Sequence, residues 1–183
     1  MARRIEYTGE PVLTLAQVAS QTRDDPEDMQ PELVEQIIIP GVTAQAEERT
    51  GAAIREAIYQ EDWPESYVSG SPLDIGQATE VQKIERVLAN GSLEELAQAW
   101  YLQRGQRESY LHFTGTRPAG VLRITYKAGA NLDAYPGVRA WLLMHAGTAY
   151  ALRETMVVGT IVARIPESYT DSLLGEIMLP PRF

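Results

Sequence analysis

The sequence contains no cysteine and only two histidines in 183 residues. Without cysteine the chain has no disulfide framework and no thiolate metal site, so it needs nothing from an oxidising compartment. His112 and His145 stand outside the HExxH and HxE spacings of common metal sites. We therefore predict no metal and no cofactor, and we interpret both histidines as packed side chains.

Long apolar runs are also missing. The least polar segment, residues 140–152, is only about half of the roughly 20 residues that span a bilayer. The basic start, residues 1–4, runs into polar residues without the apolar stretch of a signal peptide. We therefore expect no membrane segment, and synthesis in a cytoplasm.

The motifs of common enzymes are absent as well. The glycines form neither GxGxxG nor GxxxxGK[ST], so the phosphate cradles of nucleotide enzymes are missing. Residues 69–71 lack the GxSxG spacing of a serine nucleophile. The carboxylate pairs at 47–48, 61–62 and 94–95 are adjacent in sequence, which points their side chains in different directions and builds no acid/base dyad. We predict that the protein is not an enzyme and that these pairs form a solvated acidic surface.

The chain is acidic, with a net charge of -9 and a pI near 4.8. A general DNA-binding surface needs clustered lysine and arginine, which this balance argues against. An acidic surface suits a protein that stays soluble at high concentration, or one past which DNA slides without sticking. Charge alone does not choose between these two.

Two helices are predicted in the first fifty residues. Thr14 caps a short helix that runs to about Thr22. An acidic turn follows, with Asp28 as the N-cap of a second helix that ends near Gly51. Pro40-Gly41 lies inside this second helix, where proline costs about 3 kcal/mol unless the helix bends, so we predict a kink or break there.

A third helix is predicted from Pro136 to about residue 156, and it is apolar on both sides. Such a helix is either central to the core or shared with a neighbouring subunit. Its small residues at 146, 147 and 149 permit close backbone approach. The residues that we predict at a subunit interface are Trp141, Met144, Tyr150 and Arg153.

Residues 52–129 are β-rich. The clearest strand is Val121 to Lys127, where apolar and polar residues alternate. Weaker strand candidates are Ala53 to Gln60, Thr79 to Leu88 and Ser109 to Thr114.

Residues 90–103 allow two interpretations. Asn90-Gly91 is a strong signal for a hairpin with a type I′ turn. Ser92 and Glu95 also make a capping box, with apolar residues following at helical spacing. Local physics leaves strand and helix open for this segment.

The last residues form an extended piece, 161–165, then a short helix, 168–176, and an apolar ending stiffened by Pro180-Pro181. This ending is too short to fold alone. A rigid segment loses little entropy on binding, so we predict that it docks on its own domain or on a partner.

The order of these features resembles the head-tail connector (adaptor) proteins of long-tailed phages. The matching blocks, in chain order, are Pro11–Val18, the acidic turn, Ala46–Gly51, Val121–Gly129, Tyr135–Arg139, Tyr150–Glu154, Ile165-Pro166 and Leu173-Leu174. The middle of the chain, residues 67–116, matches poorly. The family pattern favours the hairpin at Asn90.

The resemblance implies a structural protein of the virion neck, between head and tail, which assembles in the host cytoplasm. Its subunits would form a homo-oligomeric ring, a dodecamer, beneath the portal protein, with double-stranded DNA passing through the lumen without sequence-specific binding. The far side would hold a stopper or tail-completion protein. The implied portal-docking residues are Leu173, Leu174, Met178, Leu179, Arg182 and Phe183.

The predicted fold class is α+β: a small helical bundle with an inserted antiparallel β-sheet or hairpin region and an extended C-terminal tail. We predict one connector domain over 1–164, with helical parts 14–51 and 136–156 and the β-rich insert 52–129, and a docking tail over 165–183. The alternatives are another neck component, a stopper or tail-completion protein, or a small metal-dependent enzyme.

Overall fold

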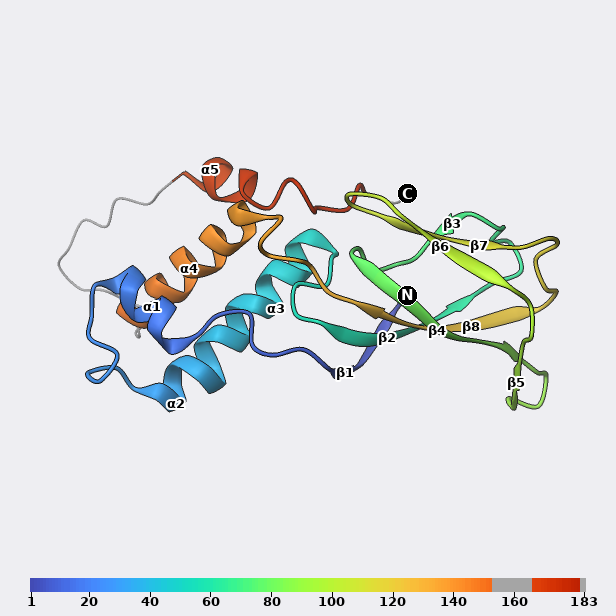
Figure 1. The fold of residues 1–183 in the computed structure, drawn as a ribbon, viewed down its shortest axis with the longest axis horizontal. Coiled ribbons are helices and arrows are strands. Elements are labelled where there is room, and N and C mark those ends of the chain that lie inside the picture. Colours follow the sequence, from blue (N-terminus) through green and yellow to red (C-terminus); the bar gives the residue numbers. More distant parts are fainter. Residues whose placement is uncertain (153–165, 182–183) are drawn as a thin grey trace. The chain divides into compact units, whose positions relative to one another are not determined.

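The computed structural model describes residues 1–152 and 166–181 (Figure 1). The architecture is α+β, as predicted. The chain divides into two compact units, each built from segments far apart in the sequence. We call the first the β unit, with Met1–Glu10, Gly51–Ala130 and Ile177–Phe183, and the second the helical unit, with Pro11–Thr50 and Asn131–Glu176.

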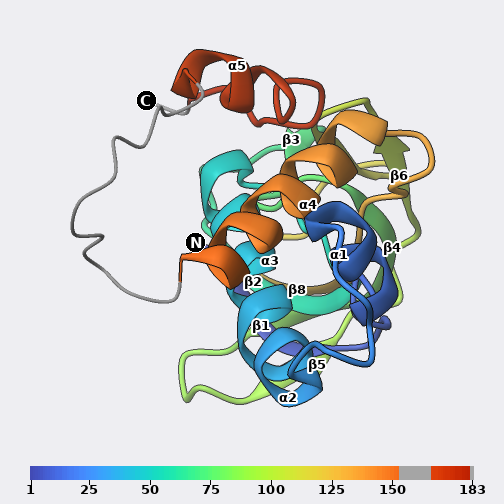
Figure 2. The same cartoon turned by 90° about the vertical axis from the view of Figure 1, so that its left-hand side faces the viewer.

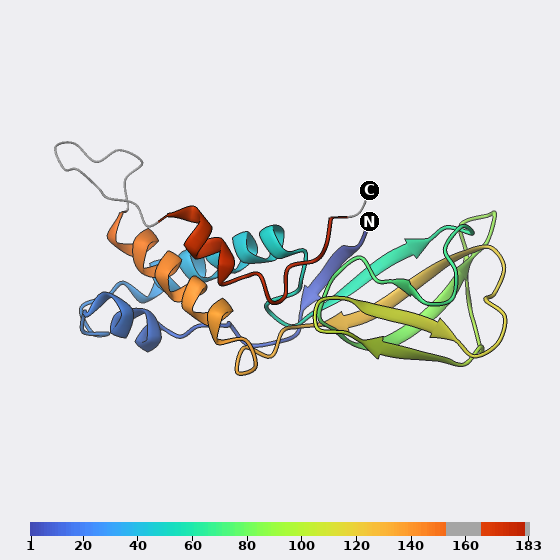
Figure 3. The same ribbon diagram turned by 90° about the horizontal axis from the view of Figure 1, so that it is seen from above.

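Two antiparallel sheets form the β unit (Figure 3). The five-stranded sheet has the order β1-β2-β8-β4-β5, and the three-stranded sheet has the order β3-β7-β6. The strands are β1 (Arg3–Tyr7), β2 (Ala57–Trp63), β3 (Ser71–Pro72), β4 (Ala78–Val87), β5 (Leu93–Glu95), β6 (Trp100–Arg104), β7 (Ser109–Phe113) and β8 (Val121–Ala128).

One apolar core lies between the two sheets. Along β8, Leu122, Ile124 and Tyr126 are buried while the residues between them are half-exposed, which is the predicted alternation. The same cluster contains Ile84 of the larger sheet and Leu111 of the smaller one. The two sheets therefore bury their inner faces against each other.

All four predicted strands are confirmed, as β2, β4, β7 and β8, although β2 begins four residues later and runs on to Trp63. Strands β1 and β3 were not predicted. The alternative of a helix at 92–103 is wrong, because this segment contains β5 and β6. Pairing with β4 and β7 outweighs the local capping signal.

The hairpin at Asn90-Gly91 is confirmed, but its turn differs from the predicted one. Only Gly91 has a positive φ, of 81°. The N–H of Gly91 donates to the carbonyl of Leu88 at 2.8 Å, and the N–H of Leu88 donates to Ser92 at 2.9 Å. This is a three-residue connection in which a left-handed glycine follows an ordinary turn, so Asn90 needs no positive φ.

The helical unit consists of α1 (Leu15–Thr22), α2 (Pro31–Leu33), the π-helical turn η1 (Val34–Ile38), α3 (Ile39–Thr50), α4 (Pro136–Ala151) and α5 (Glu167–Ser172). Figure 2 shows α1 lying against α4, and these helices pack together. Thr14 caps α1 as predicted, in a capping box with Gln17.

Asp28 is not the N-cap of the second helix. That position belongs to Gln30, whose side chain makes no capping bond, and Pro31 is the first helical residue. Proline at this position has its φ already set for a helix and no N–H to satisfy. Asp28 lies in the preceding turn, where Asp25 Oδ1 accepts the N–H of Glu27 at 3.1 Å.

The predicted irregularity at Pro40-Gly41 is a π-helical turn, and the helix does not break. Proline has no N–H, and its ring crowds the carbonyl four residues earlier. In η1 the N–H of Ile39 bonds to the carbonyl of Val34, five residues earlier. This wider turn immediately before Pro40 lets the helix run on through α3, and Gly51 ends it with a φ of 68°.

Glu61 of β2 is a carboxylate inside the core of the β unit, with 2% of its surface exposed. The indole N–H of Trp63 donates to Oε1 at 2.6 Å. The hydroxyl of Tyr126 and the main-chain N–H of Asp74 both donate to Oε2, each at 2.9 Å. A buried carboxylate is tolerated only when hydrogen bonds replace its hydration, and these three donors supply them.

Burial raises the pKa of Glu61, and the nearby charge of Asp74 adds to this, while the three hydrogen bonds oppose it. Burial also raises the pKa of Tyr126, so its hydroxyl keeps the proton that it donates. The folded chain therefore binds the Glu61 proton more tightly than the unfolded chain does. The resulting contribution to stability is full below the ordinary glutamate pKa and is lost as the pH rises through the raised one.

Replacing Tyr126 by phenylalanine removes one donor to this carboxylate. We expect Tyr126→Phe to lower the free energy of unfolding by about 1.5–3 kcal/mol at about pH 7. The loss should be smaller at about pH 3.5, where Glu61 is protonated and needs fewer donors. Urea denaturation at both pH values measures this, with Tyr67→Phe, the same change on a half-buried ring, as the control. An equal loss at both pH values would contradict the role of the anion.

Replacing Gly41 or Gly51 by alanine should change the stability of the chain in opposite directions. A Cβ at Gly51 would lie 3.0 Å from Leu179 Cδ1 on a backbone with positive φ, whereas a Cβ at Gly41 of α3 meets nothing within 4 Å. We expect Gly41→Ala to stabilise the chain by about 0.5–1 kcal/mol and Gly51→Ala to destabilise it by at least about 1 kcal/mol. Thermal unfolding of both variants checks the signs. Stabilisation by both substitutions would contradict the assigned cap.

Candidate interaction surfaces

Both histidines stack on aromatic rings, and the described residues contain no candidate metal cluster. Within residues 1–152 and 166–181, no three His, Asp or Glu side chains gather so as to hold a metal ion. His145 stacks on Trp141 with ring centroids 3.7 Å apart, and His112 stacks on Tyr101 at 4.7 Å. His112 also contacts Gln103 Oε1 through Nε2 at 2.9 Å. In this part of the chain no helix is long and apolar enough to cross a bilayer.

The three carboxylate pairs differ in their surroundings: in the pair 47–48 on α3, Glu47 is half-buried and Glu48 is exposed. Glu61 faces the core, whereas Asp62 faces outward and binds Arg123 through two bonds of 2.7 and 2.8 Å. The Arg123 guanidinium lowers the pKa of Asp62. The pair 94–95 lies exposed on β5. A buried member was not predicted, although the strand alternation places Glu61 on the same side as Trp63.

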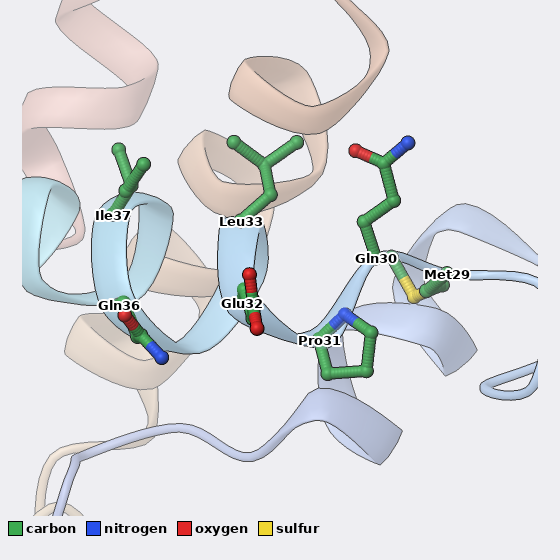
Figure 4. A pocket seen from close by; sticks show the side chains of 7 residues that line it. All are labelled: Met29, Gln30, Pro31, Glu32, Leu33, Gln36 and Ile37. Atoms are coloured by element: carbon green, nitrogen blue, oxygen red, sulfur yellow. The ribbon is translucent and has the colours of Figure 1, made fainter.

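A hollow on the helical unit is lined by α2, η1 and the residues before them (Figure 4). Its lining residues are Met29, Gln30, Pro31, Glu32, Leu33, Gln36 and Ile37. Gln30, Leu33 and Ile37 project in the same direction in Figure 4. Ile37 is 64% exposed, which is unusual for an isoleucine on a helix that buries its neighbour Ile38.

Acidic side chains border this hollow. Glu32 belongs to its lining, and Glu35 lies on the same π-helical turn as Ile37. The hollow therefore combines an exposed apolar side chain with negative charge. The sequence periodicity places Ile37 and Ile38 together on the apolar face of the second predicted helix, and for Ile37 this prediction is wrong, since its side chain is exposed.

The predicted interface residues of α4 lie in different environments. Trp141 is fully buried, and Met144 and Tyr150 are half-buried. Arg153 lies outside the described residues. Gly147 brings α4 close to α1, since a Cβ there would lie 3.3 Å from Gln21. Helix α4 is thus central to the helical unit, which was one of the two predicted alternatives.

The tail is held by the chain itself along most of the described part. Leu174 is fully buried, and Leu173, Met178 and Leu179 are half-buried. Within the β unit, the side chain of Leu179 packs over Gly51 and Gly76. Arg182 and Phe183 lie outside the described residues, as does the predicted extended piece 161–165. The expected docking on the chain's own domain therefore exists for part of the tail.

The net charge is concentrated in one unit. The helical unit contains 5 lysine and arginine and 13 aspartate and glutamate residues, a net charge of -8. The β unit contains 11 lysine and arginine and 12 aspartate and glutamate residues, a net charge of -1. The acidity that the whole sequence shows is therefore a property of the helical unit.

Substitutions at the adjacent Ile37 and Ile38 test whether the apolar side chain at the hollow contributes to the stability of the fold. Ile37 is 64% exposed and Ile38 is 7% exposed. We expect Ile37→Ser to change the free energy of unfolding by no more than about 0.5 kcal/mol, whereas Ile38→Ser should cost about 2–5 kcal/mol. Urea denaturation measures both. A large cost at Ile37 would show that this side chain belongs to the core.

No protein-family model matches the sequence, and no curated protein sequence matches it significantly. Solved structures share the fold over the full length. A chain in the neck of an empty gene transfer agent particle, computed with C6 symmetry, has a TM-score of 0.77 and 16% identity. A chain in the virion of the native particle has a TM-score of 0.76 and 18% sequence identity. A chain in the neck of the native particle, computed with C12 symmetry, has a TM-score of 0.70 and 18% sequence identity. Each alignment covers 100% of this chain and 97% of the other, so the chain has the fold of these particle components.

Proposed function

We propose that this protein is a structural, non-enzymatic subunit of the neck of a tailed phage or phage-like particle. In this proposal it is the adaptor, a ring beneath the portal that extends the DNA channel and offers its far side to a stopper or tail-completion protein. The observation that carries the proposal is the fold shared with chains of gene transfer agent necks over 100% of this chain and 97% of those chains.

A ring explains the exposed apolar side chain of the helical unit. Cyclic assemblies join two different patches of the same subunit, so each subunit keeps both patches exposed until it assembles. Two of the similar structures were computed with C6 and C12 symmetry. These symmetries support a ring of identical subunits, and we propose a dodecamer. The hollow around Ile37 is one candidate patch, and the half-buried Met144 and Tyr150 of α4 are another.

Attachment to the portal is assigned to the tail. Leu174 is fully buried and Leu179 packs over two glycines, so these side chains fix where the tail leaves the chain. Pro180 and Pro181 are exposed, and their restricted backbone lowers the entropy lost on binding. The proposed contacts with the portal are therefore made beyond Leu179, by the proline pair with Arg182 and Phe183. Leu173 and Met178, which precede these residues, are half-buried in the chain itself.

The acidity of the helical unit suits a channel component. A surface with a net charge of -8 repels phosphate, so DNA passes without sticking. The shared fold also supports another neck component, because the similar chains belong to a neck in which their particular ring is not specified. An adaptor binds the portal directly, whereas a stopper or tail-completion protein binds only after another ring is present.

The tail tests the assignment to the portal. We expect deletion of residues 180–183 to leave the thermal unfolding of the chain unchanged and to abolish co-sedimentation with isolated portal rings. The deletion keeps Leu179 and its packing, and replacing the four residues by Gly-Ser repeats of the same length controls for length. Portal binding by the shortened chain at the level of the intact one would contradict the assignment. A chain that binds only when a second ring protein is added would be a later neck component.

A further inference from the structure

The outer face of the three-stranded sheet carries aromatic and amide side chains. Tyr101 and His112 are directly paired across β6 and β7, and their rings stack in parallel at 4.7 Å. Gln103 pairs with Tyr110 in the next row of the same face. Tyr101 is 56% exposed, so the stacked pair presents a flat ring to solvent.

Local packing holds this face in shape. A Cβ at Gly70 would lie 2.9 Å from His112 Cε1, so only glycine lets the backbone approach the imidazole this closely. Gln103 Oε1 lies 2.9 Å from His112 Nε2, and Tyr110 donates its hydroxyl to Glu108 at 2.7 Å. Rigid aromatic side chains with fixed neighbours lose little entropy when a partner covers them.

Two arginines stand where β6 leads into β7: Arg104 is the last residue of β6, and Arg107 lies in the turn that follows. Arg104 and Arg107 are exposed, and neither forms an ion pair, a ring contact or a side-chain hydrogen bond with a residue that the structure describes. Every other lysine and arginine in the described part of the β unit has one. Two unpaired cations beside exposed aromatic rings are the composition of protein interfaces, in which tyrosine and arginine contribute most.

Several charged side chains on the five-stranded sheet, unlike these two arginines, are paired with one another. Its outer face is covered by ion pairs, which join Asp62 to Arg123, Lys83 to Glu85 and Glu56 to Lys127 at distances of 2.7 to 3.1 Å. These charges satisfy one another. On the smaller sheet the two arginines lie at the end of the β6–β7 strand pair and form no ion pair with a described residue, so this end fits a negatively charged partner.

We propose that this face, Tyr101, Gln103, Tyr110 and His112, together with Arg104 and Arg107 at the end of the β6–β7 strand pair, binds the acidic helical unit of a neighbouring copy in the ring. The inference rests on the proposed function, since it needs a cyclic assembly. The exposed Arg104 and Arg107 select an acidic occupant, and the helical unit is the more acidic of the two units, with a net charge of -8 against -1 for the β unit. The contact joins two different patches, as a ring requires.

The turn between α1 and α2 is the acidic counterpart. Asp24, Asp25, Glu27 and Asp28 are all exposed within five residues. Arginine pairs well with carboxylates because its planar fork donates two parallel hydrogen bonds. The contact therefore pairs Arg104 and Arg107 of one copy with this turn of the next, while the Tyr101 ring packs beside it.

Charge reversal with compensation tests the contact. We expect Arg104→Glu with Arg107→Glu to weaken portal-templated ring assembly at least about tenfold, the size of two lost charge-assisted contacts. Asp24→Lys with Asp25→Lys should weaken it similarly, and the chain carrying all four substitutions should regain assembly. Mass photometry at low and high salt measures the ring fraction, and the effect should shrink at high salt. Tyr101→Ala should also weaken assembly.

The control is Arg3→Glu with Arg4→Glu, which changes the net charge equally on the exposed strand β1 and should leave assembly unchanged. Thermal unfolding confirms that each variant folds. If the unsubstituted chain forms no ring with portal, the proposed function fails. If it forms rings and the doubly reversed arginine variant assembles equally well, only this contact is refuted. Loss of assembly without rescue, together with loss of binding to a DNA duplex, would assign the face to DNA and overturn the proposal.

Discussion

The β unit depends on an anion in its core. The carboxylate of Glu61 has lost its water, and its oxygens are instead reached by donors from Trp63, Tyr126 and the main chain of Asp74. These groups come from two strands and a loop, so satisfying one charge fixes the register of β2 against β8 and the course of the chain before β4. Removing any donor leaves a buried charge short of partners, which costs more than the bond itself contributes.

The helical unit depends on a different constraint, the route of its longest helical segment past Pro40. A regular α-helix would place the proline ring against a carbonyl, and the π-helical turn η1 avoids this by moving the hydrogen bond of Ile39 back to Val34. The extra residue in the turn also changes which side chains face outward. Ile38 is buried while Ile37 remains exposed at the hollow, so the adjustment to proline and the candidate patch share the same residues.

The proposed function places the contacts of the protein on its surfaces; the described residues contain no group of three His, Asp or Glu side chains that could hold a metal ion. Three features of these surfaces differ from an ordinary solvated exterior: an exposed isoleucine in an acidic hollow, two arginines with no partner in the described part of the chain, and a tail fixed by Leu174 and Leu179. Net charge separates the two units, with -8 on one and -1 on the other. Both units are net negative, so the proposed attraction between neighbouring copies comes from local charges, such as the exposed Arg104 and Arg107, and not from the net charges of the units.

The sequence by itself determined the features that depend on neighbours in the chain. The Thr14 cap, the alternation of β8, the hairpin at Asn90 and the end of α3 at Gly51 follow from local hydrogen bonding, side-chain period and backbone freedom. Tertiary structure decided the rest. Pairing with β4 and β7 made strands of residues 93–104, and burial separated Glu61 from the adjacent Asp62. Such outcomes depend on contacts between residues distant in sequence, whose energies no local pattern contains.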